Sequence, residues 1–115
     1  MYSILKTIKE MLGPSAEDTV FDTDIVVHIN SVLSDLHQLG VGPKEGFSIT
    51  GDLETWSDFL GEAKNLDSVK TYIYQRVKLI FDAESLSSSA ISSYERSIDR
   101  FEWRLYTAAE QNENM

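Results

Sequence analysis

Few side chains in this sequence have the types and spacing that catalysis or metal binding requires. The two histidines, His28 and His37, are nine positions apart, so on one helix they point to roughly opposite sides, and no HExxH motif accompanies them. Asp22 and Asp24 form a lone DxD pair without the further oxygen ligands and closing glutamate of an EF-hand. We therefore interpret these aspartates as residues at the start of a helix and not as metal ligands.

The sequence also lacks the motifs of common nucleotide-binding and hydrolytic sites. It contains no GxxxxGK[ST], GxGxxG or GxSxG string. It has no cysteine, which excludes disulfides, thiolate metal sites and a cysteine nucleophile. A small enzyme would need a pocket with converging carboxylates, and sequence alone does not reveal such pairs. We therefore expect no enzyme activity, no metal and no cofactor.

Length and charge limit the remaining function classes. The chain has 115 residues and 42% hydrophobic content, which suits one domain with a modest core, residues 1–115. Its formal net charge of -9 opposes affinity for DNA, because DNA binding depends on clustered Lys and Arg. The alternative is that the charge only keeps the chain soluble. The N-terminal stretch MYSILKTIKEML resembles neither a signal peptide nor a membrane span. We expect a protein that is made in the cytoplasm and does not associate with membranes.

Apolar residues recur at helical spacing in four segments, which predicts an all-α fold, a small bundle of about four helices. Glycine and proline at positions 13 and 14 end the first, short helix. Asp22 or Thr23 is the expected N-terminal cap of the second helix, and Gly40 supplies a left-handed residue at its end.

The third and fourth helices occupy the second half of the chain. The third follows Asn65, and its expected buried face comprises Leu66, Val69, Ile73, Val77, Ile80 and Phe81. The serine cluster at residues 85–89 predicts a turn. The last helix has a narrow apolar seam formed by Ile91, Tyr94, Ile98, Phe101, Leu105 and Ala108. The polar residues 109–115 are expected to form a flexible tail.

The last helix carries two features outside its seam. Trp103 and Tyr106 project away from the seam, and arginines at every fourth position form a row: Arg96, Arg100 and Arg104. Like charges at this spacing repel by a few tenths of a kcal/mol, roughly, unless acidic groups lie opposite. Either the adjacent acids Glu95, Asp99 and Glu102 neutralise the row, or the row docks on an acidic neighbour.

Residues 43–62 lack helical periodicity and are predicted to form an extended arm or loop. Residues 47–50, FSIT, alternate apolar and polar side chains between glycines, which predicts a short strand, and a single helical turn capped by Asp52 or Thr55 follows. A lone strand must pair elsewhere, and bulky apolar residues do not suit a disordered linker. The candidate anchors on a neighbouring subunit are Phe47, Ile49, Trp56 and Phe59. The alternative is that they pack against their own domain.

Four strings of residues, taken together, resemble the small helical head-tail connector proteins of tailed bacteriophages, which are also described as phage DNA-packaging proteins. The strings are FDTDIVVHINSVLSDLHQLGVGP, FSITGDLETWSDFLG, NLDSVKTYIYQRVKLIFD and SSYERSIDRFEWRL, and they cover nearly the whole chain after residue 20. They are specific in combination and weak singly. One departure is that paired prolines commonly follow the third helix in this family, where this chain has Ala83 and Glu84.

The resemblance implies a structural virion protein with no catalytic residue. Its subunits would form a ring, commonly dodecameric, which lies beneath the portal after the head is filled and carries later neck or tail proteins. The protein would be located in the neck of the virion after assembly in the host cytoplasm, and DNA would pass through the ring without specific binding. Residues 43–60 would then reach a neighbouring subunit, and the last helix would face the portal or a neighbour.

A different class of protein also fits the charge. An acidic helical inhibitor can mimic DNA, or bind another protein, by presenting carboxylates in place of phosphates. Such a mimic should concentrate its acids on one face, whereas lysines and arginines are interspersed in the second half of this chain. The sequence leaves the connector and the inhibitor as alternatives.

Overall fold

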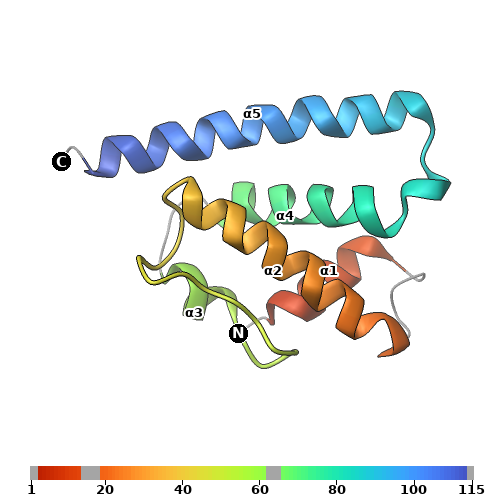
Figure 1. The fold of residues 1–115 in the computed structure, drawn as a ribbon, viewed down its shortest axis with the longest axis horizontal. Coiled ribbons are helices and arrows are strands. Elements are labelled where there is room, and N and C mark those ends of the chain that lie inside the picture. The colour runs from red at the N-terminus through yellow and green to blue at the C-terminus, as the bar shows by residue number, and fades with distance from the viewer. Residues whose placement is uncertain (1–2, 14–18, 62–65, 114–115) are drawn as a thin grey trace.

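The computed structural model describes residues 3–13, 19–61 and 66–113, the last four of these by their backbone only. These segments form five α-helices and two short 3-10 turns (Figure 1): α1 (Ile4–Leu12), η2 (Thr19–Phe21), α2 (Asp22–Gln38), α3 (Trp56–Leu60), α4 (Leu66–Phe81), η3 (Ala83–Ser85) and α5 (Ser88–Glu113). The all-α prediction is confirmed. None of the described helices is long and apolar enough to cross a bilayer.

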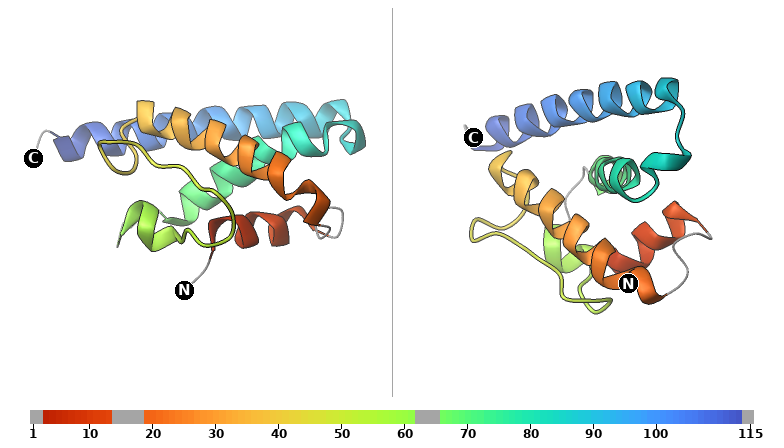
Figure 2. Two further views of the ribbon diagram at one scale, coloured as in Figure 1. Left: turned by 60° about the horizontal axis from the view of Figure 1, so that its bottom comes forward. Right: turned by 45° about the vertical axis from the view of Figure 1, so that its right-hand side comes forward.

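Helix α4 lies at the centre of the fold. It packs against α1 and α2 on one side and against α5 on the other (Figures 1 and 2). Helices α1 and α2 fill the core below it with buried aliphatic residues: Ile4, Ile8, Ile25, Ile29, Val32, Leu33 and Leu36. A helix that is apolar on more than one side must be covered on more than one side, and here the chain itself supplies most of that cover.

The two ends of α2 are fixed in different ways. The prediction that Asp22 or Thr23 caps its start is wrong, because the helix begins at Asp22 and its N-cap residue makes no side-chain hydrogen bond. Asp22 instead accepts a hydrogen bond from Lys9 Nζ at 2.6 Å, which ties α1 to α2. At the other end, Gly40 has a φ of 88°, which confirms the predicted left-handed stop.

The loop between α2 and α3 does not contain the strand that was predicted for residues 47–50. Its backbone bonds instead to one side chain of α2. The Asn30 Nδ2 group donates to the Ile49 carbonyl at 2.9 Å, and the Ile49 N–H donates to Asn30 Oδ1 at 2.7 Å. One amide side chain thus replaces the pair of hydrogen bonds that an antiparallel strand would supply. Ile49 therefore needs no second chain to satisfy its backbone.

Helix α3 holds the far end of the loop. Thr55, one of the two residues expected, caps this helix. The cap is a capping box, in which the side chains of Thr55 and Asp58 each accept a hydrogen bond from the other residue's backbone N–H. The buried Trp56 donates its indole N–H to Thr7 Oγ1 on α1 at 3.0 Å. The loop is therefore fastened to its own bundle at both ends.

A polar network joins α2, α4 and α5. Arg76 on α4 donates to Asp35 Oδ2 on α2 at 2.7 Å and to the Tyr72 hydroxyl at 2.7 Å. The Tyr72 hydroxyl donates in turn to Glu102 Oε2 on α5 at 2.7 Å. Burial is the largest single influence on Arg76 and lowers its pKa, but the hydrogen bonds and charge interactions with Asp35 and Tyr72 together outweigh burial and raise the pKa of Arg76. These charge-assisted bonds fix α5 relative to α2 through α4.

The Asn30 clamp predicts a specific loss of stability. Asn30→Ala should leave the N–H and the carbonyl of Ile49 without partners and lower the free energy of unfolding by roughly 1–3 kcal/mol. Urea unfolding followed by circular dichroism measures this change. Ser31→Ala, at the exposed neighbouring position on the same helix, is the matched control. Equal losses in the two variants would show that the clamp contributes nothing.

The tyrosines of α4 predict alkaline destabilisation. Burial and the hydrogen bond to Glu102 raise the pKa of Tyr72 above its ordinary value of 10.0, and burial with a hydrogen bond to Tyr94 raises the pKa of Tyr74 to about 12. The folded chain keeps both protons where the unfolded chain releases them. The free energy of unfolding should therefore fall as pH rises above about 10, by up to about 1.4 kcal/mol per pH unit for each tyrosine.

Urea unfolding at a series of pH values tests this expectation. The variant with Tyr72→Phe and Tyr74→Phe should lose most of the alkaline slope, because it has no hydroxyl to ionise at either position. Tyr106→Phe, at an exposed position, should keep the slope of the unmodified chain. If the double variant and the control are equally sensitive to alkali, buried tyrosines are not the cause.

Candidate interaction surface

Two of the residues whose types could suit metal binding, His37 and Asp22, form hydrogen bonds within the fold. His28 and His37 lie nine positions apart on α2, about 13 Å along the helix axis. The Nε2 atom of His37 is hydrogen-bonded to the Lys44 carbonyl at 2.8 Å, where it holds the start of the loop. Within the described segments, no group of three or more His, Asp or Glu side chains could hold a metal ion.

The four loop residues predicted to anchor a neighbouring subunit lie together on their own bundle. Ile49, Trp56 and Phe59 are buried in the core of the chain, and the Phe47 ring stacks on that of Phe59 with centroids 5.1 Å apart. Their apolar area is already removed from water, so in this conformation the buried side chains are not free to bind a partner. The large apolar side chain that the loop does expose is Leu53, at 83%.

The close docking of the loop explains one of its glycines. Gly42 has a φ of 91°, in the left-handed region, and a Cβ atom at this position would collide with the Phe59 ring. Any other residue would therefore force the ring out of the core. Tight packing on the bundle therefore accounts for Gly42, whereas a Cβ atom at Gly51 would meet no atom within 4 Å.

Helix α5 covers α4 with one side and faces solvent with the other. Its predicted seam is in contact with the core through the buried Ile98 and Leu105 and the half-buried Phe101. On the opposite side Trp103 is 69% exposed and Tyr106 is 47% exposed. The helix continues through residues 109–113, which the sequence assigned to the tail.

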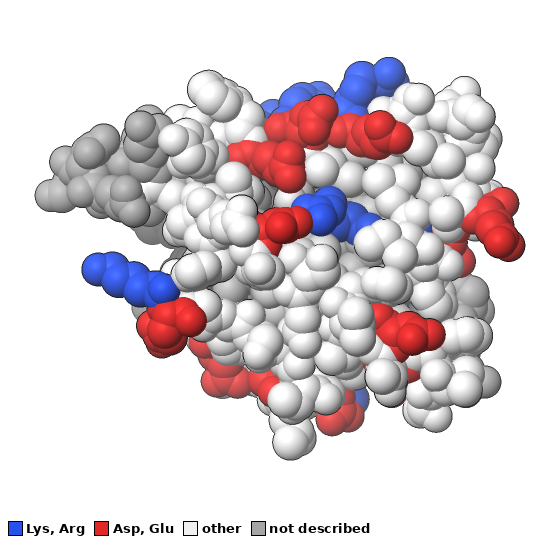
Figure 3. Space-filling view, viewed as in Figure 1, with Lys and Arg blue, Asp and Glu red and all other residues white. Residues whose placement is uncertain are grey.

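The arginine row of α5 is exposed, and in the described part of the chain no ion pair includes Arg96, Arg100 or Arg104. Glu102, one of the acids expected to neutralise the row, is turned inward to Tyr72. Figure 3 shows Lys and Arg along the upper edge of the molecule over α5, with Asp and Glu just below them. We define the outer face of α5 as Arg96, Arg100, Trp103, Arg104 and Tyr106.

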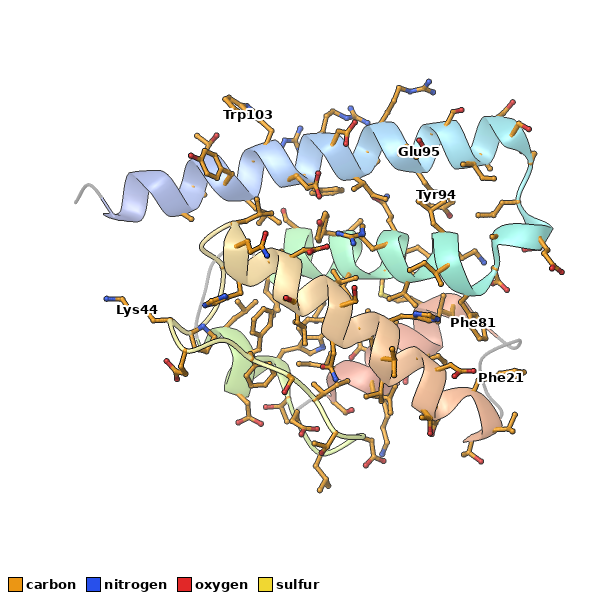
Figure 4. The ribbon with its side chains drawn as sticks, in the orientation of Figure 1. Phe21, Lys44, Phe81, Tyr94, Glu95 and Trp103 are labelled. Atoms are coloured by element: carbon orange, nitrogen blue, oxygen red, sulfur yellow. The ribbon has the colours of Figure 1, made fainter. Side chains whose placement is uncertain are left out.

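A second apolar surface lies at the other end of the bundle. The Phe21 ring of η2 and the Phe81 ring of α4 meet edge to face with centroids 5.5 Å apart, and Phe21 is 38% exposed. Ile80 was expected on the buried face of α4 but is 50% exposed. Successive helical residues are about 100° apart around the axis, so Ile80 and Phe81 do not both face the core. We call Phe21, Ile80 and Phe81 the aromatic end; Figure 4 shows its two rings far from Trp103.

Carboxylates border the aromatic end. Each of its phenylalanines is followed by an aspartate that is paired with a lysine: Asp22 with Lys9 at 2.6 Å, and Asp82 with Lys78 at 2.8 Å. Asp24 and Glu84 lie a few residues further on, are exposed, and take part in no ion pair among the described residues. The aromatic end is therefore apolar and acidic, whereas the outer face of α5 combines two aromatic side chains with three exposed arginines, beside which Glu95 and Asp99 are also exposed. Sequence reasoning missed this surface, although the acids beside each phenylalanine were a visible signal.

Comparison with known families bears on what these surfaces serve. A family model described as phage connector protein matches residues 4–112, a span that includes both the aromatic end and the outer face of α5. No significant match was found among curated proteins or among solved structures. The family match agrees with the resemblance seen in the sequence and extends over nearly the whole chain. The protein therefore belongs to the phage connector family.

Proposed function

We propose that this phage connector protein is a ring-forming head-tail adaptor that docks on the portal and helps to complete the head and attach the tail after DNA packaging. The observation that carries the proposal is the family match over residues 4–112. The ring is a dodecamer in the neck of the virion, assembled in the host cytoplasm, and it also carries a downstream neck or tail completion protein.

The distribution of exposed groups supports a role in assembly. A closed ring needs two different patches on each subunit, because each copy contacts one neighbour with one patch and the other neighbour with the second. The outer face of α5 and the aromatic end are two such patches, and Figure 4 shows Trp103 of the first far from Phe21 and Phe81 of the second. In this proposal the outer face of α5 meets the portal or a neighbouring subunit, and the exposed tip of the loop at Leu53 adds a further apolar contact.

The net charge of -9 fits the passage of DNA through such a ring. Carboxylates that line the bore repel the phosphate backbone, so the duplex finds no place to bind as it moves. The alternative of an acidic DNA mimic requires carboxylates gathered on one surface. The exposed arginine row on α5 does not favour that alternative.

Binding to the portal tests the proposed function. The chain, co-expressed with the portal protein of the same phage or prophage, should sediment with portal rings, and electron microscopy should show an added layer of density on one side of the portal. A variant with Trp103→Ala and Tyr106→Ala should be retained on portal rings about 30-fold less well, because aromatic anchors at interface centres contribute about 2 kcal/mol or more.

The control for this experiment is Val27→Ala, which removes an exposed apolar side chain of α2 outside both patches. It should bind portal rings as the unmodified chain does. A chain that never sediments with portal rings would contradict the adaptor function. If the double variant were fully retained on portal rings, the outer face of α5 would not take part in binding to the portal.

A further inference from the structure

The outer face of α5 and the aromatic end are complementary to each other. We propose that the outer face of α5 on one subunit binds the aromatic end of the next subunit, an inference that rests on the proposed ring function and assigns its subunit contact. The partner is thus a second copy of this chain. Trp103 packs on the Phe21 and Phe81 rings, and the arginine row reaches the carboxylates that border them.

The placement of the two patches suits a contact that repeats around a ring. Arg96, Arg100 and Trp103 lie on one side of α5, since positions i, i+4 and i+7 of a helix share a face. Figure 4 shows Trp103 at the top of the molecule and the aromatic end on its right-hand side. Copies joined through different patches on different sides form a ring when the rotation closes.

The apolar parts of the two patches can cover each other. Among the described aromatic residues, Trp103 is the most exposed, at 69%. In the aromatic end, Phe21 is 38% exposed and Ile80 is 50% exposed. The edge-to-face phenylalanine pair offers both a ring face and a ring edge, the two geometries in which an indole packs well. Tryptophan is also among the residues that most often dominate binding energy at interface centres.

The charges of the two patches are opposite and largely unused within the chain. The guanidinium groups of the row have no ion-pair partner in the described segments, and neither have Asp24 and Glu84. The lysines nearest the aromatic end, Lys9 and Lys78, are already bound to their own aspartates. A guanidinium binds a carboxylate through two parallel hydrogen bonds, so contact between copies would pair these groups with fixed geometry.

Site-specific cross-linking tests which surfaces meet. The chain has no cysteine, so the variant with Thr23→Cys and Thr107→Cys carries one thiol beside each patch and no other. A short bismaleimide should then produce a ladder of covalent oligomers, both with the concentrated protein alone and with the protein assembled on portal rings. Each single variant should give dimers at most. The proposal would be overturned if the double variant gave dimers alone, as expected if α5 contacts α5. It would also be overturned if neither preparation gave a cross-linked product.

A charge exchange tests the polar part of the contact. Arg100→Glu and Glu84→Arg should each weaken association of the chain about tenfold or more in analytical ultracentrifugation, and the two changes together should restore it. Lys44→Glu makes the same change of charge on the loop, where Figure 4 shows Lys44 apart from Trp103 and far from Phe21 and Phe81, and should have little effect. Absence of rescue in the double variant would count against the assigned pairing.

The outcomes separate this contact from the proposed function. If the chain binds portal rings but yields neither the ladder nor the rescue, the adaptor function stands and the assigned contact is wrong. If the ladder and the rescue occur with a chain that does not bind portal rings, the contact stands and the adaptor function is wrong.

Discussion

Burial of α4 on opposite sides is the constraint on which the rest of the structure depends. Because α1 and α2 cover one side of α4, the other side has to be covered by α5, which uses its apolar seam for that purpose. The remaining surface of α5 must then face solvent with its arginines and aromatic side chains. A helix that stabilises the monomer with one side can thus present an assembly surface with the other.

The middle loop illustrates how a chain can satisfy a lone extended segment without a second strand. The amide of Asn30 supplies both a donor and an acceptor to Ile49, and the capping box of α3 holds the other end. Trp56 and Phe59 are thereby drawn into the core, and Gly42 makes room for the Phe59 ring. The bulky residues of the loop therefore contribute to the stability of one subunit, and the exposed apolar area shifts to α5 and to the aromatic end.

The net charge of the chain conceals a separation of charge on its surface. The carboxylates near the aromatic end are in excess over the lysines that pair with them, whereas the exposed arginines of α5 form no ion pair with any residue that the structure describes. Oppositely charged patches of this kind favour association between copies in one orientation and disfavour contact between like patches. In the proposed ring, this separation of charge would give the subunits a preferred direction of assembly.

Local signals in the sequence determined the helices, the glycine stop after α2, the capped turn at Thr55 and the phage connector family. These depend on residues close together in the chain, where periodicity and capping chemistry act. Only the tertiary structure decided that Asn30 takes the place of a strand, that Glu102 turns inward and that Ile80 stays exposed. Each of these depends on which helix face meets which distant segment, and the free energy of such a contact arises from groups that sequence spacing does not bring together.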